Sequence, residues 1–455
     1  MYNILPGPRG TLIGGSIKEI KRKGILDFYG QQWRSYGDCF QVRFAHKRIV
    51  VLVHPHHAHE VLLEKRDNYI KGASHDGIRL LIGDSVFTAN NERWAKQRRV
   101  MRDSFTMQSI NNYVPIMARA LQHTCARLGE LAASLEYLDL SREMRRFTLR
   151  ALSESLFGTA SFVGDLSVET PVENFGIRFI ERTNQATPLP LWVPTRSNRE
   201  FKAARTACLA RLTQLMEMSG SNHDAEGTTA TQKLLLHRLK DSVASAGPDH
   251  MTARQAFDEF ITMYFAGHET TANALTWIFY LLDQHEDVRE KLLRELDAQE
   301  LGEAPNMNDL SALPYTHMVI AEALRLYPPA WVIARDTVMD DVIGGYRIPK
   351  GSVVLTTPYF AHRHPDFWQD PELFCPERFA GESARKTLKE GYMPFGHGQR
   401  ICLGNLFSLV EIKLAVAILA KKFLLRLKPG LMIREEARVV LVPDKPLEMS
   451  VETRG

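Results

Sequence analysis

The most informative stretch of this 455-residue sequence is Pro394-Phe395-Gly396-His397-Gly398-Gln399-Arg400-Ile401-Cys402-Leu403-Gly404. Its closely spaced glycines let a backbone bend tightly and approach a flat object. Cys402 stands where the loop gives way to a helix with apolar periodicity. A helix N-terminus lowers the pKa of a thiol, because it offers partial positive charge and free amide donors. Arg400 would match an acidic group on whatever the thiolate holds.

Three interpretations of Cys402 compete: an inert buried thiol, a nucleophile, and a ligand. An inert thiol is the commonest case, but it explains neither the glycines nor the arginine around Cys402. A nucleophile is disfavoured because the loop lacks the Gly-x-Cys-x-Gly counterpart of a nucleophile elbow. A thiolate ligand of a metal or of haem iron fits better. The other four cysteines suit the inert reading, and five widely spaced cysteines predict neither a disulfide framework nor a structural zinc site.

The segment resembles the Phe-x-x-Gly-x-Arg-x-Cys-x-Gly signature of the cytochrome P450 family at every fixed position. The matching residues are Phe395, Gly398, Arg400, Cys402 and Gly404. The resemblance implies that Cys402 is the axial ligand of the iron of haem b. It also implies that Phe395, Gly396, Gly398 and Gly404 shape the loop against the haem.

A second signal lies in a long predicted helix. Thr252-x-x-Gln255 has the form of a capping box, and the helical pattern continues to about His285. Such a helix is on the order of 45 Å long and must cross the whole protein. In its middle lies Ala266-Gly267-His268-Glu269-Thr270-Thr271, where the glycine costs about 1 kcal/mol relative to alanine. The weak spot is either a tolerated imperfection or a local opening of the helix that faces a ligand.

This stretch resembles the Ala-Gly-x-Glu/Asp-Thr motif of the same family. By that resemblance Thr270 supports proton delivery to dioxygen, Glu269 relays protons, and Ala266 and Gly267 lie beside the haem. Cleaving the O–O bond takes two protons in a pocket that otherwise excludes water. His268 is expected to be a packed structural residue.

Two further groups of residues fit the resemblance. Glu322 and Arg325 would alone be a surface pair worth under about 1 kcal/mol. In the family, however, a Glu-x-x-Arg pair is locked by an arginine, here Arg378 of Pro376-Glu377-Arg378-Phe379, in a structural network near the thiolate. Trp94 and three arginines are expected at the haem propionates. The three are Arg98, Arg335 and Arg400.

Basic residues surround Arg98. They are Arg93, Lys96, Arg99 and Arg102. These neighbours form either a solvated face or a docking patch for an acidic electron-transfer protein. We prefer the second interpretation, because complementary charge speeds the encounter of two proteins. Electrons are expected from NAD(P)H through a ferredoxin or flavodoxin-type donor with its reductase, because no reductase domain follows Cys402.

Composition predicts an ordinary folded protein, with 44% hydrophobic and 24% charged residues. Lys+Arg 57 against Asp+Glu 53 gives a net charge of +4 without long charge runs, which does not suggest a nucleic-acid partner. No stretch approaches 18 consecutive apolar residues, and the first residues lack a signal-peptide pattern. We therefore expect a monomeric cytoplasmic protein without a membrane anchor.

The predicted fold is mainly α with a small β-rich part, in one catalytic domain over residues 1–455. Residues 41–44 and 48–53 predict a hairpin, and residues 331–334, 342–348 and 353–355 predict a small sheet. Prolines at 188, 190 and 194 and a polar loop over 219–231 interrupt the helices without dividing the chain. The resemblance implies the cytochrome P450 fold, with haem b between the long helix and the cysteine loop.

The expected activity is a haem-thiolate monooxygenase that inserts one atom of O₂ into a hydrophobic small molecule, as a tailoring step in natural-product biosynthesis. By family analogy the pocket is lined by residues 71–90, 188–197, 330–333 and 439–443, with Ala266. The side chains expected to contact the substrate are Leu81, Val86, Phe87, Ala266, Thr270, Val332 and Ile333. Other possibilities are a fatty-acid or terpenoid hydroxylase, a peroxide-driven or non-oxidative haem-thiolate enzyme, a haem sensor, and a cysteine hydrolase.

Overall fold

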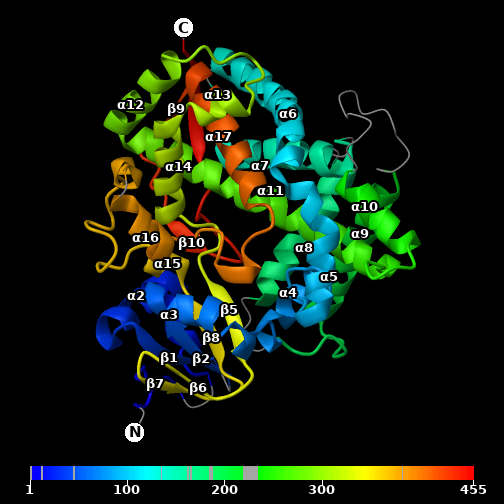
Figure 1. Cartoon of the computed structure of the whole chain (residues 1–455), viewed down its shortest axis with the longest axis vertical. Helices are drawn as coiled ribbons and strands as arrows, with labels where there is room; N and C mark the ends of the chain where they lie inside the picture. The colour runs from blue at the N-terminus through cyan, green and yellow to red at the C-terminus, as the bar shows by residue number, and fades with distance from the viewer. Residues whose placement is uncertain are drawn as a thin grey trace.

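The computed structural model of the chain describes residues 3–11, 14–44, 47–134, 136–160, 163, 166–183, 188–218, 234–381 and 383–454. Helices form most of the molecule, and a small sheet lies toward the N-terminus (Figure 1). This arrangement confirms the predicted class, mainly α with a small β-rich part. The polar loop predicted over 219–231 lies outside the described residues.

The helices, in chain order, are α1 (Ile17–Lys23), α2 (Ile25–Tyr36), α3 (Pro55–His59), α4 (Asp76–Ile82), α5 (Asn91–Arg102), α6 (Met107–Ser134), α7 (Leu140–Leu152), α8 (Leu166–Thr183), α9 (Arg196–Met218), α10 (Leu235–Ala244), α11 (Ala253–Gln284), α12 (Glu286–Asp297), α13 (Met307–Ser311), α14 (Pro314–Leu326), α15 (Pro358–Ala361), α16 (Ser383–Gly391) and α17 (Asn405–Lys422). Short 3₁₀ turns include η6 (Pro376–Phe379) and η7 (Gly398–Arg400). No helix in the described part of the chain is both long and apolar enough to cross a bilayer.

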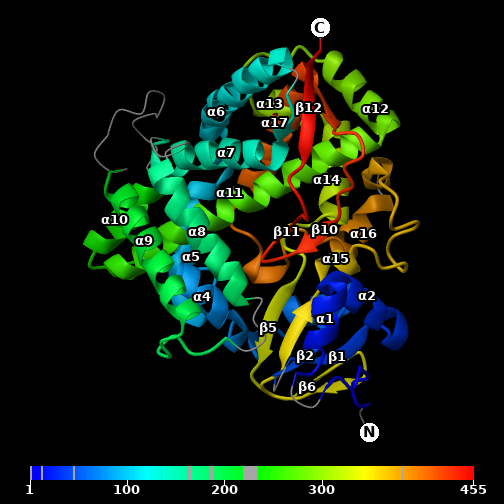
Figure 2. The same cartoon turned by 180° about the vertical axis from the view of Figure 1, so that it is seen from behind.

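The long helix predicted from the capping box is α11. The Thr252 hydroxyl accepts the N–H of Gln255, and the Gln255 side chain accepts the N–H of Thr252, so both bonds of the box are present. Its 32 residues span about 48 Å. Figures 1 and 2 both show α11 crossing the centre of the molecule beside α7 and α17. The helix can therefore present its middle to an interior site.

The principal sheet has five strands in the order β1 (Cys39–Phe44), β2 (Lys47–Leu52), β8 (Val353–Thr356), β5 (Ile333–Thr337) and β3 (Tyr69–Ile70). The predicted hairpin is β1–β2, and β2 pairs with β8 in parallel. The extended segment predicted at 331–334 begins as a strand only at Ile333, because Trp331 turns into an apolar cluster with Phe28 and Phe360. This sheet joins the N-terminal region to the segment that follows α14.

The remaining strands form three small ladders. They are β6 (Asp341–Ile343) with β7 (Tyr346–Ile348), β4 (Leu138–Asp139) with β12 (Glu448–Thr453) and β9 (Phe423–Leu427), and β10 (Glu435–Ala437) with β11 (Leu441–Pro443). The segment predicted over 342–348 is therefore a separate hairpin and not part of the principal sheet.

Candidate functional site

The cysteine loop is held by its own backbone. The N–H of Cys402 donates to Phe395 O at 3.0 Å, and the N–H of Ile401 donates to Gly398 O at 3.0 Å. Gly398 has φ +71°, and a Cβ there would lie 2.5 Å from the carbonyl oxygen of Leu62. Glycine is thus required both by the backbone conformation and by the close approach of a neighbouring chain segment. These contacts fix where Cys402 points.

Cys402 lies just before α17 and is solvent-accessible on one side, whereas protein atoms surround its sulfur on the others. Burial raises the pKa of this thiol, while the N–H of Gly404 and the nearby Arg98 guanidinium lower it. Arg98 Nη1 donates to Ile401 O at 3.0 Å, which places positive charge next to the sulfur. A bound cation would add to these two effects, because a coordinated thiol is deprotonated.

The three arginines and the tryptophan predicted at the propionates come together. The Arg400 guanidinium lies 4.1 Å from the centre of the Trp94 ring, and that of Arg98 lies 5.8 Å from it. Arg335 and Arg400 line one cavity of about 420 Å³ with Trp94. Burial lowers the pKa of both arginines to about 10, and at Arg400 the charges of Arg335 and Arg98 act in the same direction.

Two further residues that were not predicted belong to this group, Lys71 as a fourth cation and His75 as a neutral imidazole beside it. Lys71 is buried, and its ammonium donates to Phe87 O and lies 4.1 Å from the centre of the Phe87 ring. Burial holds the pKa of Lys71 well below its ordinary value, helped by Arg335 and Arg400. Burial and the same neighbours, Lys71 first, lower the pKa of His75 to about 2. The spacing Lys71-x-x-x-His75 was the only signal, and it is weak.

These cations, Lys71 and Arg335 buried and Arg400 half-buried, have no acid beside them among the described residues. Within the described residues, no carboxylate lies within 4.0 Å of Lys71, Arg335 or Arg400, whose hydrogen bonds go to carbonyl oxygens of Phe87, Ala334 and Ala89. Burying unpaired charge is costly. A ligand that carries two carboxylates, as haem b does, fits this group of residues.

The segment from Gly83 to Asn90 connects α11 with the cysteine loop. Glu259 of α11 is buried and accepts the N–H of Val86 at 2.9 and 3.1 Å. Asp258 accepts the N–H of Asp84 at 3.0 Å. At the other end, Arg400 donates to Ala89 O at 2.8 Å. The predicted substrate-lining loop is therefore fixed at both ends, by acids that the sequence analysis had not singled out.

The middle of α11 is a continuous α-helix, so the proposed local opening at 266–271 is wrong. The polar side chains bond back to the helix instead: Thr270 Oγ1 donates to Ala266 O at 2.9 Å, and Asn273 donates to Glu269 O at 2.8 Å. Such bonds to the carbonyl four residues earlier compete with the backbone hydrogen bonds and weaken a helix slightly. Ala266 is exposed in the middle of this otherwise buried helix, which indicates open space beside it.

The neighbours of Thr270 are structural. Thr271 contacts Ser408 of α17 through their hydroxyls at 3.1 Å, which joins the long helix to the helix after Cys402. A Cβ on Gly267 would lie 2.5 Å from Leu152 Cδ1, so the buried Leu152 side chain packs directly on this glycine and would have to shift for a larger residue. His268 is buried and its ring faces Tyr264 at 5.3 Å. Burial lowers the pKa of His268.

Glu322, Arg325 and Arg378 form the expected network. Arg325 donates to both carboxylate oxygens of Glu322, at 2.6 and 2.9 Å, and Arg378 donates to Glu322 Oε1 at 2.9 Å. The side chains of Glu322 and Arg325 are fully buried, so this is not the surface pair that their spacing alone would give. Arg325 also donates to the carbonyls of His362, Pro371 and Leu373, so the network ties α14 to the chain before the cysteine loop.

The residues predicted to contact the substrate differ in how deeply they are buried. Leu81 and Val86 pack on the main core, and Val332 packs on the cluster around Trp331. Phe87 is 44% exposed, whereas Leu189 and Trp192, expected to line the same pocket, are 52% and 80% exposed on the surface. Ile333 approaches the cysteine loop, since a Cβ on Gly396 would lie 3.7 Å from Ile333 Cδ1. Phe87 and Ile333 are thus the candidates nearest the cationic group and the loop.

The basic residues of α5 are partly neutralised by neighbouring acids. Arg99 pairs with Asp249 at 2.7 Å, Arg93 pairs with Asp84, and Lys96 donates to His250 O at 2.9 Å. The side chains of Arg93 and Arg99 remain half exposed. The face is therefore less strongly positive than the sequence suggests.

The sequence was compared with models of known families. The family described as Cytochrome P450 matches residues 5–451. The chain belongs to the cytochrome P450 family. Cytochrome P450 enzymes carry a haem iron bound to a cysteine thiolate and act as monooxygenases, so this protein is an oxidoreductase of that class.

Among curated proteins, the chain is similar to cyclooctatin synthase of Streptomyces melanosporofaciens, at 31% identity over 100% of this chain and 96% of that protein. It is also similar to cyclooctat-9-en-7-ol 5-monooxygenase of the same organism, at 31% identity over 87% and 84%. Pentalenene oxygenase of Streptomyces avermitilis is 26% identical over 92% and 91%.

Among solved structures, the retinoic acid bound cyanobacterial CYP120A1 superposes with a TM-score of 0.86 at 24% identity, covering 100% of both chains. This likeness shows the cytochrome P450 fold.

Proposed function

We propose that residues 1–455 act as one catalytic domain that would hold haem b between α11 and the cysteine loop, with the Cys402 thiolate as the protein ligand of its iron. The observation that carries this proposal is the group of buried cations without a carboxylate partner, next to a thiol at the start of α17. In this arrangement Arg98, Arg335 and Arg400 would bind the propionates, and Trp94 would support Arg400. Lys71 would add a fourth cation. Phe395 and the glycines of the loop would let its backbone approach the ring.

When bound, the haem supplies the activation of O₂ that inserts one oxygen atom into a hydrophobic substrate. The chain contributes protons and positioning. Thr270 presents a hydroxyl from the middle of α11, and Glu269 beside it supplies an acid that can relay protons from solvent. The intact acid–threonine pair favours a monooxygenase over a peroxide-driven or non-oxidative enzyme, because those reactions need no proton delivery to dioxygen.

We infer that the substrate is a cyclic terpenoid of secondary metabolism. The names of three similar proteins, cyclooctatin synthase, cyclooctat-9-en-7-ol 5-monooxygenase and pentalenene oxygenase, support this class. The candidate pocket residues are apolar, with Phe87 and Ile333 nearest the loop and Ala266 on α11 leaving space. Such a lining binds a compact hydrocarbon through shape and the hydrophobic effect.

Electrons would come from NAD(P)H through a separate ferredoxin or flavodoxin-type protein and its reductase. The cytochrome P450 family uses such redox partners. Helix α5 is the proposed docking surface, because Arg98 reaches from it to the residue next to Cys402. A small acidic protein bound there would sit close to the thiolate.

The first test is the absorption spectrum of the purified protein after reduction with dithionite and exposure to carbon monoxide. We expect the strongly red-shifted Soret band of thiolate-bound haem, and its loss in Cys402→Ala. The matched control is Cys125→Ala in α6, another free cysteine, which should keep the band. Absence of haem from protein expressed with a haem precursor would contradict the proposal, and so would an unchanged band in Cys402→Ala.

The substrate class can be tested with the same sample. Cyclic terpenes and terpene alcohols should shift the haem spectrum by displacing water from the iron, whereas fatty acids of similar size should not. A response to fatty acids alone would overturn the terpenoid assignment and leave the monooxygenase assignment standing.

A further inference from the structure

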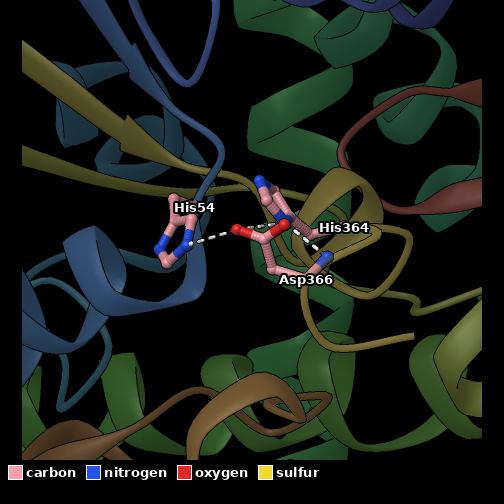
Figure 3. A group of neighbouring side chains, drawn as sticks. All are labelled: His54, His364 and Asp366. Atoms are coloured by element: carbon pink, nitrogen blue, oxygen red, sulfur yellow. Dashed lines mark hydrogen bonds and ion pairs between the residues drawn. The ribbon is translucent and has the colours of Figure 1, made fainter. Parts of the chain in front are cut away.

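Three side chains that commonly bind metals converge far from the cysteine loop in sequence. His54 follows β2 and stands at the N-cap of α3, while His364 and Asp366 lie in the loop after α15. Figure 3 shows His54 on one segment and His364 with Asp366 on another, all pointing to a common centre. One ligand atom of each lies within 4.8 Å of the others.

The separations suit a transition-metal ion. His54 Nε2 is 3.5 Å from Asp366 Oδ2, and His364 Nδ1 is 3.9 Å from the same oxygen. In a tetrahedral zinc site with bonds of about 2.0 to 2.1 Å, neighbouring ligand atoms lie about 3.3 Å apart. The two imidazole nitrogens lie within 4.8 Å of each other, so closing the site would bring them closer by up to about 1.5 Å. Asp366, whose side chain is 66% exposed, provides the side from which an ion enters.

His364 is already oriented as a ligand. Its Nε2 lies 3.1 Å from Asp38 Oδ1, and the same oxygen accepts Trp33 Nε1–H at 2.8 Å. A histidine that donates one N–H to a carboxylate has an unprotonated second nitrogen, which is the usual support of a metal-binding imidazole. Here that nitrogen, Nδ1, accepts the N–H of Asp366 at 3.3 Å, and the bond to the ion would replace this hydrogen bond.

His54 is the second imidazole, and it changes partner on binding. Without an ion its Nδ1 accepts the N–H of His56 at 3.1 Å, which caps α3. Ligation through Nε2 places the proton on Nδ1, so the bond to the ion replaces the cap.

We propose that His54, His364 and Asp366 bind one Zn²⁺ ion, with water at the fourth position. Two imidazoles and one carboxylate favour Zn²⁺ over Mg²⁺ or Ca²⁺, which prefer sites made of oxygen ligands alone. The ion would join the chain after β2 to the chain after α15. Because it binds only the folded arrangement, it stabilises the native protein.

The test uses untagged holoenzyme, with ZnCl₂ as the probe in calorimetric titration and in thermal unfolding. We expect one equivalent of Zn²⁺ to bind and to raise the unfolding temperature, while MgCl₂ does neither. His54→Asn keeps an N-cap oxygen for His56 but removes the imidazole. This variant and Asp366→Asn should each bind at least about tenfold more weakly. His59→Asn, on the same helix but beside His397, is the matched control and should bind as the wild type does.

Asp38→Asn tests the site in a second way, because this change would not weaken the binding of an ion held elsewhere on the surface. Asp38 does not touch the ion in this proposal, yet its loss should weaken binding by about tenfold through His364. Failure of the wild type to bind one equivalent would overturn the proposal. Equal affinity in the wild type and in His54→Asn would also overturn it, because the ion would then be held elsewhere.

Discussion

Thr270 presents a hydroxyl in the middle of α11, one turn after the exposed Ala266. Its Oγ1 donates to Ala266 O, so an oxygen lone pair remains free to accept a hydrogen bond from water or from an acid beside it. Thr270→Ala should retain haem and substrate binding but divert several-fold more electrons from product to hydrogen peroxide. The measurement is product and peroxide formed per NAD(P)H consumed.

Two variants separate the hydroxyl from the helix geometry. Thr270→Ser keeps a hydroxyl and should restore most of the coupling. Thr271→Ala removes the neighbouring hydroxyl, which contacts Ser408, and should leave coupling unchanged. Full coupling in Thr270→Ala would contradict the assigned role.

Lys71 is the residue whose charge most needs a partner. It is buried among Arg335 and Arg400, and its ammonium has only a carbonyl and the Phe87 ring as contacts within the described residues. If haem carboxylates complete this group, Lys71→Met removes a charge-assisted hydrogen bond worth about 1.5 to 3 kcal/mol. Haem transfer to apomyoglobin should then be faster by roughly tenfold or more.

The control for this experiment is Lys202→Met on α9, an exposed lysine that should leave the transfer rate unchanged. Equal rates in Lys71→Met and the wild type would place the propionates away from Lys71.

The roles of some single residues could be predicted from the sequence, and those of others could not. Cys402, Arg400 and the loop glycines could be predicted, because their chemistry depends on neighbours within ten residues along the chain. Lys71 and His364 could not, since each acquires its role from residues far away in sequence, such as Arg335 for Lys71 and His54 for His364. Such contacts leave no periodic signal in one sequence.

At the scale of elements, the loop at 83–90 depends on α11 for its position. Glu259 accepts the Val86 N–H and is fully buried. Burial raises its pKa from the ordinary 4.5 to about 8, against the lowering effect of that hydrogen bond, and Asp258 and Asp84 add to the rise. The folded protein thus keeps a proton on Glu259 that the unfolded chain releases.

The sign of the resulting pH dependence follows from linkage. Because the folded pKa lies above the unfolded one, the contribution of Glu259 is fully present below pH 4.5 and is lost as pH rises through about 8. Glu259→Gln keeps an oxygen for Val86 and cannot titrate. The free energy of unfolding is measured in urea at several pH values from 5 to 8. With each pH unit it should fall less steeply for the variant than for the wild type, by up to about 1.4 kcal/mol. Parallel curves would contradict this assignment.

Elements with local signals were predicted well, and those that depend on packing were not. The capping box at Thr252 fixed the start of α11 within one residue, since both of its bonds lie within one turn. The strand β5 starts at Ile333 because Trp331 donates to Arg438 O and packs in an apolar cluster, a contact with the C-terminal turn that no local pattern indicates. The helix is continuous through 266–271, with the Thr270 and Asn273 side chains bonded to carbonyls of the preceding turn, which the sequence pattern did not indicate.

At the scale of the whole molecule, one side of the protein brings α5 close to the cysteine loop. Arg98 reaches Ile401 O from this helix, and a Cβ on Gly404 would lie 3.7 Å from Phe105, just after it. An electron donor bound to this face has a short path to Cys402. Basic residues on the outer side of α5 can guide an acidic donor to it, although Asp249 offsets the charge of Arg99.

The docking surface can be tested by two changes of opposite sign. Lys96→Glu should slow reduction by an acidic ferredoxin several-fold at low salt, because it replaces attraction with repulsion. Asp249→Asn should speed it, because it frees the charge of Arg99. Both effects should shrink as salt rises, since screening removes forces between exposed charges. Lys21→Glu on α1, which Figure 2 places by the sheet and apart from α5, makes the same change in net charge and should leave the rate as it is.

Stopped-flow reduction under carbon monoxide measures all four proteins, the wild type and the three variants. If Lys96→Glu and Lys21→Glu slow reduction equally, only net charge matters and the donor binds elsewhere. If Asp249→Asn alone fails to accelerate, Arg99 is not part of the surface that the donor contacts.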